Sequence, residues 1–354
     1  SFDLDRMPPN PGVHRQDRYR ASFWNYIKKR LPSWYVDTAE LFGLVPLRRL
    51  GEGTGTDTTN NVHSLFHFVF TTPPETLTWR VQRAIEAVFY HHPNAKVIMH
   101  SRSLPVSGTR LDCFAETGYD FEIRPYSLET LLKKSSTVSE QDRTKFFEVL
   151  EARKKGDFWY SHETDLIRLL VMETHGGVYM DTDMHAIKPF PKSLRNVLAY
   201  QDHLTPQRAL KLALVPKVNG AVMIFEKDNQ FLRELVTEAM NRVIYHYDAS
   251  NWEILGPYLM SDTWRAHQRK TPHDQTVEVL SSAAFYPYSF GNAHGCFQDL
   301  EFFNPITDQT YAVHLNTKIT SEFQSTSKGT YCDTMFHTHC IFCDEVYTAP
   351  AATT

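Results

Sequence analysis

From about residue 62 onward, apolar blocks alternate with amphipathic stretches, which predicts alternating strands and helices. Residues 62–70 form an apolar run typical of a buried strand. Residues 75–91 then predict a helix whose apolar stripe consists of Leu77, Val81, Ala84, Ile85 and Val88. A second apolar run at 95–99 completes a strand, helix, strand unit, for which parallel strands are expected.

The alternation continues to about residue 318 and predicts one large α/β domain. Further strands are expected at 121–126, 197–200, 218–225 and 310–318, and helices at 128–155, 228–246 and 255–268. With 354 residues and 42% hydrophobic content, the chain can bury a sizeable core.

The stretch from residue 162 to 190 is the most informative part of the pattern. Its first half predicts a helix with Ser161 as N-cap, because Leu166, Leu169, Leu170 and Met172 recur at three- and four-residue spacing. Two glycines end that helix, and the apolar run 178–180 predicts a short strand. Asp181 and Asp183 follow this strand, and the carboxyl end of a strand in an α/β sheet is where a ligand crevice is expected.

Two carboxylates at this position suit a hard divalent ion shared with substrate phosphates. Asp165 and Arg168, at i and i+3, share one face of the preceding helix, in a segment that otherwise reads as buried. On the pair alone, a structural ion pair is favoured over a ligand contact. The Asp-x-Asp motif alone is also a weak signal.

Charge and apolar runs exclude some classes of protein. The net charge is -4 and the pI is near 6.5, with dispersed Lys and Arg residues, so no nucleic-acid partner is expected. No apolar run reaches the ~20 residues that cross a bilayer, and the first residues show no signal-peptide pattern. The sequence opens at Ser1 without a methionine, and we expect an anchoring segment to lie outside it.

Five cysteines allow two disulfides and one thiol in an oxidising compartment, with a connectivity that spacing does not decide. They are Cys113, Cys296, Cys332, Cys340 and Cys343. The last three, with His337 and His339, also have the residue types of a zinc site. Their spacing matches no standard zinc pattern, so a disulfide is favoured.

Residues 1–50 combine Pro, Arg and the aromatic residues Trp24, Tyr26, Trp34 and Tyr35, which predicts a segment that packs on the main domain. Residues 51–61 form a polar loop rich in Gly, Thr and Asn. The loop lacks the preceding strand and the Gly-Lys-Ser/Thr ending of a phosphate-binding loop, so we interpret it as a connector.

The ordered set of Asp165-x-x-Arg168, apolar helix, Gly-Gly, apolar strand and Asp181-Thr-Asp183 is more specific than any of its parts. As a set it resembles the glycosyltransferases with a DXD sugar-binding region. The closest resemblance is to the α-1,4-galactosyltransferase-like (Gb3 synthase-like) group of glycosyltransferase family 32.

Further elements between residues 62 and 318 carry the same resemblance. They are Asn219-Gly220 at the start of an apolar strand, Gly256-Pro257 at the start of a helix, and Tyr311-Ala-Val-His314 followed by Lys318. Each is ordinary by itself, as a turn, a first helical turn or a structural histidine. The chain departs from the family at Asn316, where relatives usually have an aromatic residue, which bears on the sugar or acceptor.

The resemblance implies roles for individual residues. Asp183 is expected to bind the metal directly, with Asp181 contacting metal, ribose or donor sugar and His314 as a third ligand. Asp165 and Arg168 are expected at the donor sugar, with Asn219 as a further catalytic candidate. The remaining donor-binding candidates are Gly177, Tyr179, Gly256 and Lys318. By fold analogy, Thr71 and Thr72 would lie near the base and ribose.

The resemblance also implies an α/β fold of the GT-A type, a Rossmann-like nucleotide-binding mixed sheet flanked by helices. Its expected bounds are residues 62–330, with 1–61 as a packing segment and connector and 331–354 as a Cys/His-rich tail. The implied enzyme is a retaining hexosyltransferase that uses Mn²⁺ or Mg²⁺ and a UDP-sugar, with galactose or N-acetylglucosamine as the favoured hexose. A glycan, glycolipid or glycoprotein would be the acceptor, and the lumen of the Golgi the location, as the catalytic part of a single-pass type II membrane protein.

Two other classes fit parts of the pattern. An Asp-Thr-Asp after an apolar strand also suits a HAD-type phosphatase, with the first Asp as nucleophile. That class needs a later paired-acid motif, and the sequence has no Asp-Asp. A sugar-binding pseudo-transferase would keep the fold without turnover.

Overall fold

The computed structural model describes residues 62–203, 216–270, 277–298, 304–323 and 326–343. The predictions for residues 1–61 lie outside these ranges. Among the described helices, none combines the length and the apolar character that a membrane crossing requires.

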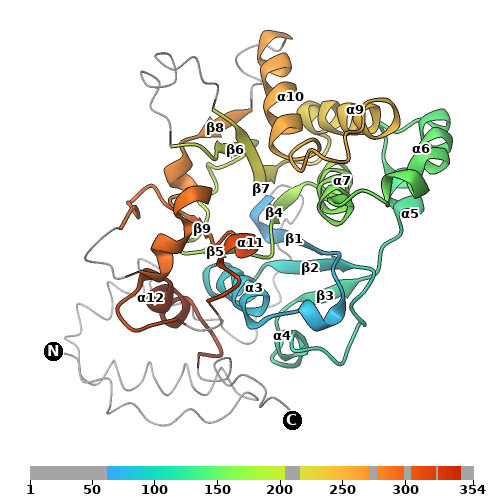
Figure 1. Ribbon diagram of the computed structural model, residues 1–354. Coiled ribbons are helices and arrows are strands. Elements are labelled where there is room, and N and C mark those ends of the chain that lie inside the picture. The colour runs from blue at the N-terminus through green and yellow to red at the C-terminus, as the bar shows by residue number, and fades with distance from the viewer. Residues whose placement is uncertain (1–61, 204–215, 271–276, 299–303, 324–325, 344–354) are drawn as a thin grey trace, which may run out of the picture.

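A seven-stranded sheet forms the centre of the molecule, in the order β3-β2-β1-β4-β7-β6-β8 (Figure 1). The strands are β1 Leu65–Phe70, β2 Lys96–Ser101, β3 Phe121–Arg124, β4 Gly177–Met180, β6 Val197–Tyr200, β7 Val218–Phe225 and β8 Glu278–Leu280. Among these described strands, β7 alone runs antiparallel to its neighbours. A separate two-stranded sheet pairs β5 (Met184–Ala186) with β9 (Ala312–His314). The expected α/β fold class, a mixed sheet flanked by helices, is confirmed.

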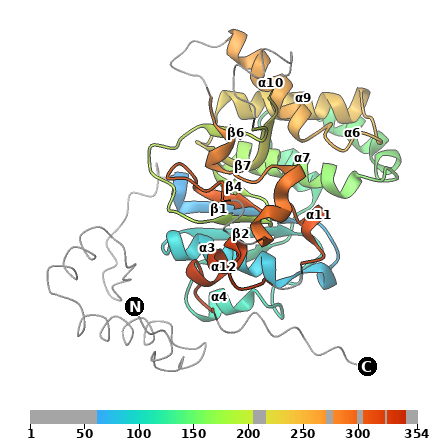
Figure 2. The same ribbon diagram turned by 60° about the vertical axis from the view of Figure 1, so that its left-hand side comes forward.

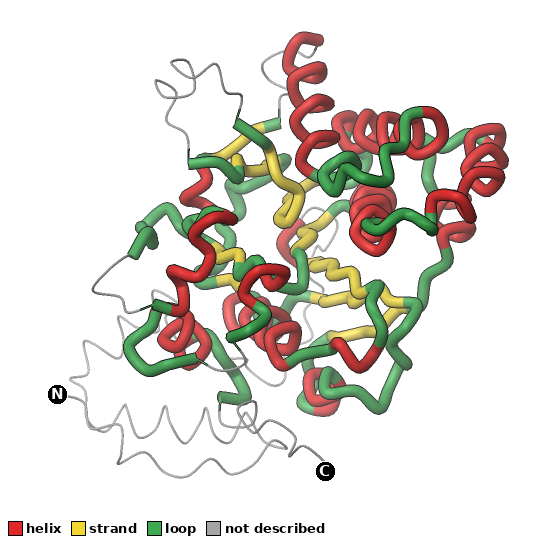
Figure 3. The backbone as a smooth tube through the Cα atoms, in the orientation of Figure 1, coloured by secondary structure: helices red, strands yellow, loops and turns green. Residues whose placement is uncertain are grey.

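Helices cover both faces of the large sheet, so the strands lie between two groups of helices (Figures 2 and 3). One group comprises α3 Trp79–His91 and α4 Asp112–Glu116. The other comprises α5 Leu128–Lys134, α6 Glu140–Arg153, α7 Trp159–His175, α9 Gln230–Tyr245 and α10 Pro257–Lys270. Each group buries its own apolar core against one sheet face, as a layered α/β domain requires. Two short helices, α11 Thr317–Thr320 and α12 Tyr331–Thr338, follow β9.

Two predicted helix starts are wrong. The helix expected from residue 75 begins at Trp79, because Pro74–Thr76 form a separate 3-10 turn. The central helix α7 begins at Trp159, so Ser161 lies inside its first turn and is not the N-cap. The Ser161 hydroxyl instead accepts a hydrogen bond from the indole N–H of Trp252 at 2.9 Å.

The turn from α7 into β4 requires both of its glycines. Gly176 and Gly177 have φ values of 64° and 102°, a region that side chains rarely adopt. A Cβ on Gly177 would lie 2.6 Å from the carbonyl oxygen of Leu65 in β1. The tight turn therefore sets β4 directly beside β1, with α7 packed above them.

Alternation along β4 determines where the acidic motif faces. Val178 and Met180 belong to the core on the α3 side of the sheet, whereas Tyr179 belongs to the core on the α7 side. Because side chains alternate with a period of two, Asp181 follows Tyr179 onto the α7 side. The strand thereby directs the first acid of the motif toward the helix that carries Asp165 and Arg168.

The cysteines near the end of the chain form disulfides, as the sequence favoured. Cys296 is bonded to Cys332 and Cys340 to Cys343, and Cys113 lies outside both bridges. These bonds use the thiols that a zinc site would need. The segment after α12 is also tied to α3, where the buried Glu86 carboxylate accepts the backbone N–H groups of residues 341 and 342.

Candidate active site

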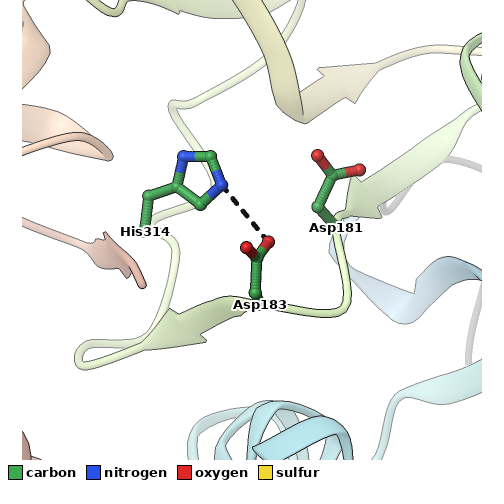
Figure 4. A group of neighbouring side chains, drawn as sticks. All are labelled: Asp181, Asp183 and His314. Atoms are coloured by element: carbon green, nitrogen blue, oxygen red, sulfur yellow. Dashed lines mark ion pairs between the residues drawn. The ribbon is translucent and has the colours of Figure 1, made fainter. Parts of the chain in front are cut away.

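The acidic motif and a distant histidine meet beyond the carboxyl end of β4 (Figure 4). Asp181 directly follows β4, and Asp183 directly precedes β5. Pairing of β5 with β9 sets Met184 opposite His314, which brings the histidine beside the motif. His314 Nε2 lies 3.2 Å from Asp183 Oδ1, and each of the three residues offers a ligand atom within 4.8 Å of the other two.

The chemistry of this donor set fits a divalent cation. Two carboxylates and an imidazole are suitable ligands for Mn²⁺, and carboxylates also suit Mg²⁺. Burial opposes the ionisation of Asp183, but His314 and the backbone N–H of Thr317 together lower its pKa to about 2. Burial raises the pKa of Asp181, against the effect of Arg168. A cation bound between the two carboxylates would offset the cost of burying them.

Helix α7 supplies a guanidinium that is shared between two acids. Arg168 Nη2 lies 2.8 Å from Asp181 Oδ1 and 3.1 Å from Asp165 Oδ1, so the predicted i,i+3 ion pair is present. The Tyr179 hydroxyl donates to the same Asp181 oxygen at 2.6 Å, and the guanidinium lies 4.9 Å from the Tyr179 ring centroid. Burial raises the pKa of Asp165 to about 7, although the charge of Arg168 favours the anion. The arrangement fixes the orientation of Asp181 before any ligand arrives.

Two cavities meet at these residues, and Arg168, Asp181 and Asp183 line both of them. The smaller, of about 350 Å³, is also lined by Thr71, Thr72, Arg80, Tyr160 and Thr317. The larger, of about 490 Å³, is also lined by Asp165, Asn219, Trp252, Phe290, His314 and Lys318. Asp181 and Asp183 therefore lie where the two cavities meet, and His314 lines the larger cavity beside them.

Three of the predicted donor-binding residues do not line either cavity. Gly177 lies at the other end of β4, where its backbone conformation and close approach to β1 explain the glycine. Tyr179 is fully buried and holds Asp181 by its hydroxyl. Gly256 leaves room for Asp165, because a Cβ there would lie 3.2 Å from Asp165 Oδ2. The structure thus gives each of the three a structural role outside the cavity lining.

Asn219 lines the larger cavity, but both ends of its amide already have partners. Its Oδ1 accepts the backbone N–H of Ala221 at 2.8 Å, and its Nδ2 donates to Gln201 Oε1 at 2.9 Å. The first bond is the local contact expected of an Asn beside a strand entry. Asn219 is therefore held in a fixed orientation at the cavity wall.

Sequence reasoning missed several residues of the site. Arg80 on α3 reaches the smaller cavity and donates to Thr320, which holds the segment after His314 in place. Thr317 donates its backbone N–H to Asp183 Oδ2 at 2.8 Å. Trp252 lies four residues before Gly256, and its closeness to the Gly256-Pro257 element could have marked it as a candidate site residue. A backbone donor such as Thr317 leaves no such signal.

Two regions of the chain match the models of known protein families. Residues 78–205, which include α7, β4 and both acids, match the family described as "Glycosyltransferase sugar-binding region containing DXD motif". This part of the chain is thus similar to the sugar-binding region of DXD glycosyltransferases. Residues 225–347, which include His314, match the "Alpha 1,4-glycosyltransferase conserved region" of the Gb3 synthase group. The resemblance seen in the sequence is confirmed.

Individual relatives are distant. The chain is 25% identical over 252 residues to lactosylceramide 4-alpha-galactosyltransferase of Rattus norvegicus, covering 66% of this chain and 62% of that protein. It is 26% identical over 193 residues to alpha-1,4-N-acetylglucosaminyltransferase of Homo sapiens, covering 51% of each. An uncharacterized protein of Arabidopsis thaliana is 24% identical over 291 residues, covering 78% of this chain and 42% of that protein. The chain thus spans about 40 to 60% of the length of these relatives.

Solved glycosyltransferase structures resemble the chain more weakly. PaToxG glycosyltransferase gives a TM-score of 0.40 at 17% identity, covering 59% of this chain and 70% of that one. The UDP-bound glycosyltransferase domain of the YGT toxin gives 0.39 at 10% identity, covering 64% and 81%.

Proposed function

We propose that the protein is a metal-dependent, retaining glycosyltransferase that moves a hexose from a UDP-sugar to a hydroxyl group of an acceptor. Galactose and N-acetylglucosamine are the favoured hexoses, because the names of two relatives specify these sugars. The observation that carries the proposal is the Asp181, Asp183 and His314 group between two cavities, with Arg168 and Asp165 on its wall.

We assign the smaller cavity to the nucleotide. Thr71 and Thr72 line it at the carboxyl end of β1, and in open α/β sheets ligands bind outside that end of the strands. Arg80 adds positive charge on the same side, which suits a diphosphate. The donor sugar and the acceptor then share the larger cavity, next to Asp165 and Asn219.

Departure of the diphosphate requires that its negative charge be stabilised. A divalent ion held by Asp181, Asp183 and His314 would supply Lewis acidity at the phosphate oxygens. Lys318 lines the larger cavity together with His314, so its ammonium would add a positive charge to that of the metal ion. Asp165 would accept hydrogen bonds from donor-sugar hydroxyls, and Arg168 would contact sugar or phosphate oxygens.

We further propose that retention occurs by attack on the face from which the diphosphate leaves. A double displacement needs a free carboxylate under the anomeric carbon, whereas Asp165 and Asp181 both engage Arg168 and the Asn219 amide is weakly nucleophilic. Proton NMR of the first product tests this. An α-linked product from an α-configured donor is expected, and a β-linked product refutes retention. A glycosyl adduct trapped on either Asp overturns the same-face mechanism.

The acceptor is proposed to be a glycan, glycolipid or glycoprotein, and the location to be the Golgi lumen, with a membrane tether outside this chain. The choice of acceptor is supported by the relative whose name contains lactosylceramide, a glycolipid. The proposed domain bounds remain 62–330 for catalysis, with 1–61 and 331–354 as flanking segments.

Release of UDP from a panel of UDP-sugars, with Mn²⁺, Mg²⁺ or EDTA, tests the proposed function. Slow hydrolysis of one donor that stops in EDTA is expected, and UDP-galactose and UDP-N-acetylglucosamine are the first candidates. Binding of UDP without any turnover identifies a pseudo-transferase. Metal-dependent hydrolysis of a phosphomonoester with no UDP release identifies a phosphatase and refutes the proposal.

A further inference from the structure

The larger cavity is also lined by a pair of aromatic residues to which the proposed donor site gives no role. Trp252 and Phe290 both line this cavity, with ring centroids 6.1 Å apart. Phe290 leaves 47% of its surface exposed. An exposed ring at a cavity mouth gains energy when a ligand covers it, because its apolar surface leaves water.

Trp252 is fixed in place before any ligand binds. Its indole N–H donates to Ser161 Oγ on α7, and its carbonyl oxygen lies 3.2 Å from the ring Nε2 of the buried His162. Ser161 also lines both cavities, so the tryptophan is tied to the element that carries Asp165 and Arg168. A rigid ring costs little conformational entropy on binding, which is a property of binding sites.

Polar groups complete the wall around the aromatic pair. Lys217 forms an ion pair with Glu253 at 2.6 Å, and its backbone N–H donates to Asp202. Gln201 also lines the cavity, so this wall offers both hydrogen-bond donors and hydrogen-bond acceptors. Around the aromatic pair the acids Asp202 and Glu253 are matched by Lys217 and Lys318, so the wall has no excess positive charge that would favour an anionic ligand.

An apolar face bordered by hydrogen-bonding groups matches the chemistry of a sugar ring, which has C–H groups on its faces and hydroxyls at its edge. We propose that Trp252 and Phe290 stack the terminal sugar of an uncharged glycan acceptor in the larger cavity. This inference rests on the proposed function and adds the class of acceptor and the residues that recognise it.

Lys318 links this subsite to the donor. Its ammonium lies 3.9 Å from the Trp252 ring centroid and 5.3 Å from that of Phe158, so a cation covers the tryptophan in this structure. A diphosphate attracts an ammonium more strongly than an aromatic ring does, because it carries full negative charge. Donor binding therefore draws Lys318 off Trp252 and uncovers the stacking face, so the acceptor binds after the donor.

Saturation-transfer NMR with defined glycosides tests the subsite. The probes are methyl galactosides, methyl glucosides, methyl N-acetylglucosaminide and lactose, with sialyllactose as the anionic comparison. Each is titrated against the full chain, with and without UDP and Mn²⁺. The variants are Phe290→Ala, Trp252→Leu and Lys318→Ala, and the matched control is Phe147→Ala, which removes a 39% exposed ring from α6 outside both cavities.

Wild type loaded with UDP and Mn²⁺ is expected to bind at least one neutral glycoside and to bind sialyllactose less well. Phe290→Ala and Trp252→Leu should weaken that binding by roughly tenfold, whereas Phe147→Ala should leave it unchanged. Lys318→Ala should bind the glycoside without UDP. Phe290 is exposed, so its variant carries the test even where Trp252→Leu fails to fold.

The proposal is overturned if UDP-loaded wild type binds none of the neutral glycosides, or if Phe290→Ala binds them as wild type does. Equal binding by wild type with and without UDP overturns the part assigned to Lys318. Hydrolysis of a UDP-sugar needs no acceptor, so wild type and Phe147→Ala carry it out whether or not a glycoside binds, if the proposed function holds. Loss of the acceptor subsite and loss of the donor reaction are therefore separate results.

Discussion

Arg168 is the residue on which the site's charges converge. Its guanidinium contacts both Asp165 and Asp181 and stacks on the Tyr179 ring. Asp165 is 5% exposed and Arg168 is 6% exposed, so their pairing offsets part of the cost of burying charge, while burial still raises the pKa of Asp165 to about 7. The structural ion pair and the ligand contact were opposed interpretations of the sequence, yet one buried pair can fill both roles when it also lines a cavity.

At this scale, Asp165→Asn should separate sugar recognition from nucleotide binding. The change removes a charged acceptor, and kcat/KM for the UDP-sugar should fall about 10- to 100-fold. UDP affinity should change less than about threefold. Stability should fall only slightly, because Arg168 keeps its contact with Asp181.

The matched control for that change is Asp262→Asn in α10, since Asp262 and Arg265 form an i,i+3 pair outside both cavities. Steady-state kinetics, calorimetry with UDP and thermal unfolding give the three readouts. A stability loss of about 3–5 kcal/mol with unchanged specific activity would show that the Asp165 pair is only structural.

Among the described elements, the long apolar runs could be predicted, whereas two of the three-residue strands, β5 and β8, could not. The strand predictions 197–200 and 218–225 agree with β6 and β7, because continuous burial gives an unmistakable apolar pattern. β5 and β8 have three residues each, too few to show a period, and both were missed. β5 matters most, because its pairing with β9 is what brings His314 to Asp183.

The candidate site divides in the same way. Residues on α7 and at the end of β4 could be located from local pattern, since helix and strand periods determine their direction. His314 was assigned to the site by family resemblance alone, because it lies 131 positions after Asp183 in the sequence. Trp252, Phe290 and Arg80 escaped prediction, because the walls of a cavity depend on how distant segments pack.

At the α7 to β4 turn, Gly177→Ala tests whether that glycine serves the backbone. Alanine there adopts an unfavourable φ and its Cβ meets Leu65 O, so we expect a stability loss of about 2–5 kcal/mol. Gly108→Ala is the control, because φ is +84° with no atom within 4 Å, and about 1–2 kcal/mol is expected.

Chemical denaturation gives both values. Equal losses in the two variants would mean that the approach to β1 is not restrictive. A stable Gly177→Ala with specifically weakened UDP binding would restore Gly177 as a donor contact.

Over the whole molecule, buried histidines connect stability to pH. Burial lowers the pKa of His91 and His100 to about 3 and that of His92 and His339 to about 4. The unfolded chain, with histidine pKa values of about 6.5, then binds more protons than the folded chain below that pH. Stability is therefore complete above about pH 6.5 and falls as the pH drops toward 4, by about 1.4 kcal/mol per pH unit for each such histidine.

Denaturant unfolding between pH 4 and 8 measures this slope. His339→Gln should reduce the slope, because the variant has one fewer group that takes up a proton on unfolding. His246→Gln, at an exposed position after α9, is the control for the substitution itself. A stability that is constant from pH 8 to 4 would contradict the burial of neutral histidines.

The fold joins two cavities at one acidic group, and our proposal assigns the nucleotide to one cavity and the sugars to the other. Both matched regions contribute residues to this acidic group: Asp181 and Asp183 come from the first region, 78–205, and His314 comes from the second, 225–347. The contacts of α3 with the end of the chain hold the second region against the first, and the disulfide between Cys296 and Cys332 lies within the second region. Metal binding and nucleotide binding should therefore depend on each other.

Titration of UDP into the protein by calorimetry, with Mn²⁺ and with EDTA, measures that dependence most directly. Wild type and the exposed-site control Asp120→Asn should bind UDP with Mn²⁺ and lose at least about tenfold in affinity in EDTA. Asp183→Asn keeps the shape of the side chain and removes the ligand charge, so it should show the weak affinity under both conditions with a nearly unchanged Tm. Wild-type affinity for UDP in Asp183→Asn, or equal affinity of wild type with Mn²⁺ and with EDTA, would contradict a metal-dependent donor site at this acidic group.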